Sequence, residues 1–177
     1  MNKRIRSVCV TAAFTALLCV LSPLTVPMPI GVPFTLQTPL IALTAFLLGA
    51  KAGTAATAAY ILLGFCGLPV FSGFGAGVSA AVSPTGGFIF AFPFFALVLS
   101  FVFYVNNRAA RVLLGTAALI LLYAAGASWF VIVTKTGAAA IIAFIPYFIK
   151  DTVALFAAYF LSGRIRPAVI DCIHPSR

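Results

Sequence analysis

The chain has 177 residues, of which 63% are hydrophobic and only 7% are charged, with a mean hydropathy of +1.20. Soluble domains carry about 25% charged residues, so the composition excludes one and predicts an integral membrane protein. The net charge of +9 comes from basic residues that stand singly or in small groups between apolar runs, a pattern typical of membrane topology signals and not of a nucleic-acid surface. Since a helical span needs about 20 mostly apolar residues, we expect residues 1–177 to form one membrane-embedded domain, an all-α bundle of six transmembrane helices.

The first predicted span covers about residues 7–21 and follows a basic segment. This pattern also suits a signal peptide, but no small-x-small cleavage site precedes Pro23, so we expect a retained helix. Residues 23–33 contain four prolines, which exclude regular helix and predict an extended segment. A second span is predicted over about 35–50, and after a tight glycine turn a third span reaches Phe65.

Six glycines and two prolines stand between Gly67 and Phe88, without one charged residue. Glycine permits positive φ and close approach of the backbone to a ligand. Irregular backbone at membrane depth survives only where protein buries it or where it lines a cavity. The stretch is therefore a candidate binding loop, and a flexible hydrophobic connector is the alternative.

Three further spans are predicted over about residues 87–105, 112–133 and 147–161. Before the last of them lies a short apolar run, which we expect Pro146 to end. With both termini in the cytoplasm, nine basic residues lie in inner segments and only Lys135 and Lys150 in outer ones, which agrees with the positive-inside rule. The inner nine are Lys3, Arg4, Arg6, Lys51, Arg108, Arg111, Arg164, Arg166 and Arg177. This orientation gathers the proline-rich segment, the glycine-rich stretch and the start of the last span on the outer face.

Few polar side chains in the predicted spans could contact a bound ligand. Asp151 stands at the outer start of the last span, where an ionisable group is a functional candidate, although a carboxylate there also suits a helix N-terminus. Gln37 offers an amide donor and acceptor, and an interhelical hydrogen bond is its alternative role. Aromatic residues that could wall a pocket, or instead anchor the chain at the membrane interface, are Phe34, Phe71, Phe74, Phe88, Trp129 and Tyr147.

Several catalytic signatures are missing from the sequence. It has no Walker-type phosphate loop, no cluster with metal-ligand spacing and no second intramembrane carboxylate for acid–base work. We therefore expect neither an enzyme nor a bound cofactor or metal.

Ala12 and Ala16 form a small-xxx-small pair in the first span, and such a pair lets another helix approach closely.

Four segments together carry a resemblance to a known family. They are Val32–Thr38 (Val-Pro-Phe-Thr-Leu-Gln-Thr), Leu47–Gly49, Gly64–Phe71 and Ser83–Phe88 (Ser-Pro-Thr-Gly-Gly-Phe). In this order they resemble the BioY family, the biotin-specific substrate-binding subunits of energy-coupling-factor transporters. The resemblance covers nearly the whole chain, up to the basic segment that ends at Arg166.

The resemblance implies a six-helix bundle that binds biotin from outside with high affinity. It also implies three partners, namely one transmembrane coupling protein and two cytoplasmic ATPases, with Ala12 and Ala16 docking on the coupling protein. In the family, the last helix commonly opens Pro-aromatic-x-x-x-Asp-x-x-Lys, but here position 154 is alanine and Lys150 precedes the aspartate. The expected substrate-binding residues are Phe34, Gln37, Phe71, Gly73, Gly75, Gly77, Thr85, Gly86, Phe88, Tyr147, Lys150 and Asp151.

Asp151 and Gln37 are expected to meet the ureido edge of biotin, with the stretch from Gly67 to Thr85 as a lid. Two other functions remain open at this point. One is a substrate-binding subunit for another vitamin, such as thiamin or riboflavin. The other is a stand-alone facilitator that works without ATPases. For each of these functions we expect a multi-pass protein of the prokaryotic cytoplasmic membrane.

Overall fold

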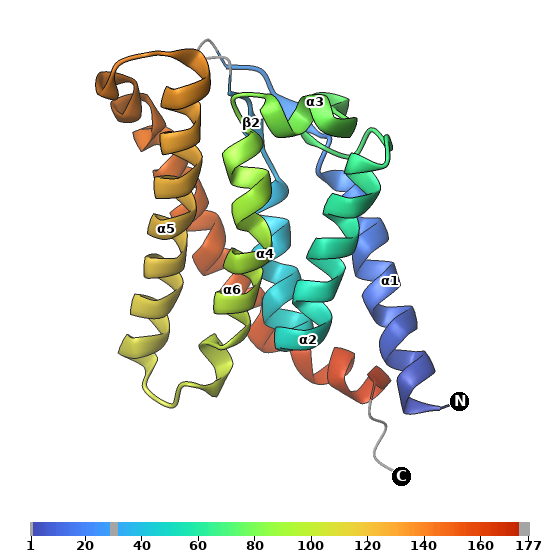
Figure 1. Cartoon of the computed structure of the whole chain (residues 1–177). Coiled ribbons are helices and arrows are strands. Elements are labelled where there is room, and N and C mark those ends of the chain that lie inside the picture. The colour runs from blue at the N-terminus through green and yellow to red at the C-terminus, as the bar shows by residue number, and fades with distance from the viewer. Residues whose placement is uncertain (1, 29–31, 174–177) are drawn as a thin grey trace.

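The computed structural model describes residues 2–28 and 32–173, and it is almost entirely helical (Figure 1). Part of the proline-rich segment and Arg177 therefore lie outside the described residues. Two short strands and three 3₁₀ segments (Ser72–Phe74, Val102–Tyr104 and Ala138–Phe144) connect the helices. The elements are α1 (Lys3–Leu21), β1 (Thr25–Val26), β2 (Phe34–Thr35), α2 (Gln37–Phe65), α3 (Gly77–Val82), α4 (Gly86–Ser100), α5 (Arg108–Thr134) and α6 (Ile145–Ile173).

Helix α2 reverses direction at Gly49, whose backbone (φ 77°, ψ −175°) is not helical. A continuous helix would hold Gln37 and Tyr60 about 34 Å apart, yet their side chains share a hydrogen bond of 2.6 Å. The two arms pack so closely that a Cβ on Gly53 would lie 2.9 Å from the Cα of Ala45. The arms run antiparallel, side by side (Figure 1), and they correspond to the second and third predicted spans.

Five helices of the described residues are long and apolar enough to cross a membrane, with α2 counted once. The prediction of an all-α membrane protein is thus confirmed. Helix α1 begins and α6 ends at the same end of the bundle (Figure 1). Six separate crossings and cytoplasmic termini stay predictions.

The core lies where α2 meets its neighbours. Helix α2 packs against α1, α4 and α6, and α5 packs mainly against α4. Fully buried side chains from α2, α4 and α5, among them Ile41, Phe92 and Leu119, form one apolar cluster. The remaining helices and the loops are positioned by their packing against this cluster.

One predicted boundary was wrong, because helix α6 continues to Ile173, past the predicted end at residue 161, and includes Pro167. The short apolar run forms the 3₁₀ segment that ends at Phe144, and α6 begins at Ile145, two residues before the predicted start. Pro146 stands in the first turn of α6, where the missing N–H of proline costs no helical bond. The glycine-rich stretch is only partly irregular, since it contains a 3₁₀ turn and the six-residue helix α3.

The proline-rich segment is extended where it is described, as predicted. Strands β1 and β2 pair antiparallel, with Thr25 opposite Thr35 and Val26 opposite Phe34. The pair lies near α3, at the end of the bundle opposite the start of α1 (Figure 1). It brings Phe34, Thr35 and Gln37 to the place where α6 begins.

Candidate ligand-binding site

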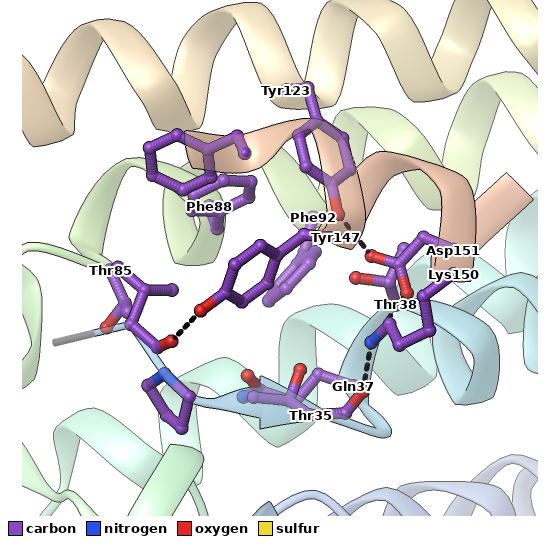
Figure 2. A pocket seen from close by; sticks show the side chains of 13 residues that line it. Thr35, Gln37, Thr38, Thr85, Phe88, Phe92, Tyr123, Tyr147, Lys150 and Asp151 are labelled. Carbon is purple, nitrogen blue, oxygen red and sulfur yellow. Dashed lines mark hydrogen bonds and ion pairs between the residues drawn. The ribbon is translucent and has the colours of Figure 1, made fainter. Parts of the chain in front are cut away.

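A pocket opens at the end of the bundle that carries the β-strands. It encloses about 430 Å³ of empty space, including space open to the outside. Segments far apart in the chain converge on it: the β2–α2 junction and the starts of α4 and α6, with one side chain from the middle of α5 (Figure 2). The lining residues are Val32, Pro33, Thr35, Gln37, Thr38, Thr85, Phe88, Phe92, Tyr123, Phe144, Tyr147, Lys150 and Asp151.

Asp151 is the buried carboxylate of this pocket, with 5% of the residue exposed. The hydroxyl of Tyr123 donates a hydrogen bond of 2.7 Å to its Oδ2. The ammonium of Lys150 lies 2.8 Å from Oδ1, but Oδ1 receives no hydrogen bond of good geometry from any described residue. A buried carboxylate needs a partner for its charge and for each oxygen, so Oδ1 has capacity for a further N–H donor.

Lys150 links α6 to the β-strand pair. Its Nζ donates a hydrogen bond of 2.8 Å to the carbonyl oxygen of Thr35 (Figure 2). The same atom lies 5.4 Å from the ring centroid of Phe34, within the range of a cation–π contact. About a third of the lysine side chain, 31%, remains exposed. Lys150 therefore neutralises Asp151 and holds β2 against α6 at the same time.

Gln37 lies across the pocket from Asp151 and is 5% exposed (Figure 2). Its Nε2 donates to the hydroxyl of Tyr60, which in turn donates to the carbonyl oxygen of Val70 at 3.1 Å. Within the described chain no group donates to Oε1 of Gln37. The structure thus gives Gln37 the interhelical bond and a place in the pocket together.

Aromatic rings form the apolar walls. Tyr147 donates its hydroxyl proton to the carbonyl oxygen of Val32, and its ring meets that of Phe34 edge-on with centroids 4.4 Å apart. The rings of Phe88 and Tyr123 are also edge-on, at 5.5 Å. These contacts fix the ring planes, so the pocket offers a preformed slot to a flat, partly apolar ligand.

Six of the twelve predicted binding residues line the pocket: Gln37, Thr85, Phe88, Tyr147, Lys150 and Asp151. Phe34 packs directly behind Tyr147. Phe71 is instead a core residue, 2% exposed, whose ring packs on Tyr60 and Phe65. The predicted residues that do not line the pocket also include Gly73, Gly75, Gly77 and Gly86.

Gly86 has a packing role at the start of α4. A side chain there would overlap the carbonyl of Ala81 and approach the indole of Trp129. The indole N–H of Trp129 donates a hydrogen bond of 3.0 Å to the carbonyl oxygen of Ser83. The end of the glycine-rich stretch is therefore tied to α5.

Seven lining residues were not predicted: Val32, Pro33, Thr35, Thr38, Phe92, Tyr123 and Phe144. Thr35 and Thr38 stand within two residues of Gln37, and this nearness in the sequence could have indicated that they line the same pocket. Tyr123 stands alone in the apolar sequence of α5, and only the packing of α5 beside α6 brings it to Asp151. No spacing in the sequence indicates that contact.

Ala12 and Ala16 lie on α1, far from the pocket, and both are exposed. They line an open groove between α1 and the second arm of α2. The facing arm contributes mostly small residues, Ala52, Ala55 and Ala59. The small side chains on both sides leave room for another helix to approach closely.

The described residues thus form a helical membrane protein with a pocket at one end of the bundle, and Asp151 is the buried carboxylate that lines it. A sequence profile described as the BioY family matches residues 1–171. The chain belongs to the BioY family.

Named relatives agree. The biotin transporter BioY of Thermotoga maritima is 36% identical over 89% of this chain and 94% of its own length. The probable biotin transporter BioY of Pyrococcus horikoshii is 32% identical over 91% and 96% of the two chains. These relatives are named as transporters, so the chain is a transport protein and not an enzyme.

A solved structure described as the S-component for biotin from an ECF-type ABC transporter has a TM-score of 0.85 to this chain. The match covers 94% of this chain and 93% of the other, at 23% sequence identity. At that identity the match establishes the fold alone.

Proposed function

We propose that this protein binds biotin in the pocket around Asp151 and delivers it across the cytoplasmic membrane. Biotin has a ureido edge with two N–H donors, an apolar bicyclic ring and a carboxylate tail. The under-bonded Oδ1 of Asp151 is the observation that supports the proposal, because it is a buried, charged acceptor suited to a ureido N–H. Gln37 lies opposite and adds amide groups for the same edge, and the rings of Phe88, Phe92 and Tyr147 enclose the bicycle.

Lys150 is proposed as the counter-ion of Asp151. The alternative role for Lys150 is to meet the carboxylate tail of biotin, but its ammonium is already 2.8 Å from Oδ1 of Asp151 and 2.8 Å from the Thr35 carbonyl oxygen. It would have to leave both to reach a carboxylate at the far end of biotin. Holding the aspartate ionised is the role that this geometry supports.

Equilibrium binding of radiolabelled biotin to the purified protein tests the proposal. We expect saturable binding that unlabelled biotin displaces and that thiamin and riboflavin leave unchanged. Absence of saturable biotin binding, together with saturable binding of labelled thiamin or riboflavin, would assign the pocket to another vitamin.

We further propose that residues 1–177 act as one membrane-embedded substrate-binding subunit, driven by a coupling protein and two ATPases. The exposed groove at Ala12 and Ala16 supports this assembly. The rival is a facilitator that works alone. Biotin uptake by cells that express this chain without an energising module distinguishes them, because only the facilitator would then accumulate or exchange biotin.

The segment from Gly67 to Thr85 is proposed as the lid of the pocket. Its backbone has positive φ at Gly67, Gly73 and Gly77, conformations that residues with a side chain adopt less readily. Docking on the coupling protein would release biotin only if the partner binds the open state more tightly than the closed one.

A further inference from the structure

The end of the bundle opposite the biotin pocket contains an arginine that has no acidic partner among the described residues. Arg111, near the start of α5, is half-buried. Its Nε donates to the carbonyl oxygen of Val105 at 2.6 Å, and its Nη1 donates to the hydroxyl of Tyr159 at 3.3 Å. The described residues contain a single ion pair, Lys150–Asp151, and it lies at the other end. Arg111 is thus held in place by neutral acceptors, and its Nη2 and part of Nη1 are left for an anion.

A second guanidinium lies close by. The Cζ of Arg166 is 4.5 Å from the ring centroid of Phe103, and that of Arg111 is 6.0 Å from the same centroid. The ring of Tyr159 stacks on Phe103 at 5.5 Å and 15°. The Nε of Arg166 is buried and has no hydrogen-bond partner in the described part of the chain. Two like charges on one aromatic ring repel each other, and a bound anion would relieve that repulsion.

An apolar cavity begins at Arg111. It holds about 300 Å³ of empty space, including space open to the outside, and lies between α5 and α6, with Phe46 of α2 and Val102 behind. Gly115 has no side chain to fill this space. A Cβ at that position would meet no atom closer than one of Leu155, 3.6 Å away. Arg111 is the one charged residue of the lining, which otherwise consists of Phe46, Val102, Val112, Gly115, Thr116, Leu155, Phe156 and Tyr159.

We propose that this cavity binds an anionic phospholipid, with the phosphate on Arg111 and one acyl chain between α5 and α6. Guanidinium is the side chain best matched to phosphate, with which it forms paired, charge-assisted hydrogen bonds. Basic pockets between transmembrane helices are suited to lipid headgroups. The cavity lies along two membrane-spanning helices, where lipid is the neighbouring molecule, so an acyl chain is the natural occupant of its apolar part.

Thermal unfolding of the purified protein in detergent tests the lipid site. Phosphatidylglycerol and phosphatidylcholine are added at equal concentration, with inorganic phosphate as a third arm. We expect phosphatidylglycerol to raise the Tm by several degrees more than phosphatidylcholine does, and phosphate alone to have no effect. Arg111→Gln should abolish the difference between the lipids, and Gly115→Leu, which fills the acyl site, should reduce it.

Arg108→Gln is the matched control, since Arg108 has the same charge, lies one turn before Arg111 and is exposed outside the cavity. It should keep the full phosphatidylglycerol effect. Biotin binding by each variant verifies folding, because the biotin pocket lies at the other end.

The proposal is overturned if both lipids stabilise the unchanged protein equally, if Arg108→Gln loses as much as Arg111→Gln, or if inorganic phosphate alone reproduces the effect. If Arg111→Gln does not fold, Arg111→Lys and Gly115→Leu decide, and a full lipid effect in both would contradict the site.

Discussion

At the scale of single residues, the site depends on how one buried carboxylate is held. Tyr123 donates to Oδ2 of Asp151, and Lys150 balances its charge from the side of Oδ1. A hydrogen bond to a charged group contributes about 1.5–3 kcal/mol. Because the hydroxyl of Tyr123 occupies Oδ2, we expect it to orient the carboxylate so that Oδ1 faces the proposed ligand. In this proposal Tyr123 is a positioning residue.

Tyr123→Phe tests this role. The change removes only the hydroxyl, so the wall of the pocket stays and the carboxylate loses its orientation. We expect the Kd for biotin to rise about three- to tenfold, equivalent to roughly 0.7–1.4 kcal/mol. Tyr104→Phe is the control, since Tyr104 is 68% exposed and outside the pocket. Equal affinity in the Tyr123 variant and the unchanged protein would show that Asp151 needs no such support.

The polar members of the site could be predicted from the sequence, and their apolar surroundings could not. Asp151 and Gln37 stand out because charged and amide side chains are costly in apolar spans. Phe92 and Phe144 belong to a chain with 18 phenylalanines, so nothing local distinguishes them. Phe71 was predicted to bind the substrate because its neighbours are loop residues, but it does not line the pocket, and its ring fills the space that Gly64 leaves in the core.

At the scale of elements, one glycine of α5 makes room for a wall of the pocket. Gly126 lies where the ring of Phe88 packs, and a side chain there would overlap that ring. Phe88 belongs to the pocket wall. Helix α5 thus determines how far Phe88 extends toward the ligand.

Gly126→Ala should weaken biotin binding by about tenfold or more, because the new methyl group pushes Phe88 into the pocket. A titration of the purified variant measures the effect. Gly163→Ala in α6 is the control, since nothing lies within 4 Å of a Cβ at that position. If both variants bind biotin like the unchanged protein, Phe88 has another way to accommodate the methyl group and does not limit the pocket.

The helices themselves were largely predictable, because apolar length and glycine or proline breaks determine them. The reversal at Gly49 was predicted from the glycine turn, and the structure explains it by a positive φ. The start of α6 lies two residues before the predicted one, because proline breaks a helix from inside but is an ordinary residue in the first turn. The convergence of α2, α4, α5 and α6 on one pocket depends on tertiary packing and has no local signal.

At the scale of the whole molecule, the proposed functions occupy separate surfaces. The biotin pocket lies at one end, the basic lipid cavity toward the other, and the groove of Ala12 and Ala16 along α1. A change in one surface should therefore leave the others intact.

Ala12→Trp combined with Ala16→Trp tests this separation. Two indoles would fill the groove and prevent a coupling protein from approaching α1. We expect biotin binding by the purified variant to match that of the unchanged protein, and uptake to stop in cells that contain the coupling module. Continued uptake would place the docking surface elsewhere.

Titration of Asp151→Asn with radiolabelled biotin, side by side with the unchanged protein, tests the assignment of the pocket. The amide keeps the size of the side chain but removes the charge that a ureido N–H would meet and that Lys150 balances. We predict that the Kd rises at least about tenfold, or roughly 1.4 kcal/mol. An unchanged Kd would exclude Asp151 from the biotin site and contradict the function proposed for this pocket.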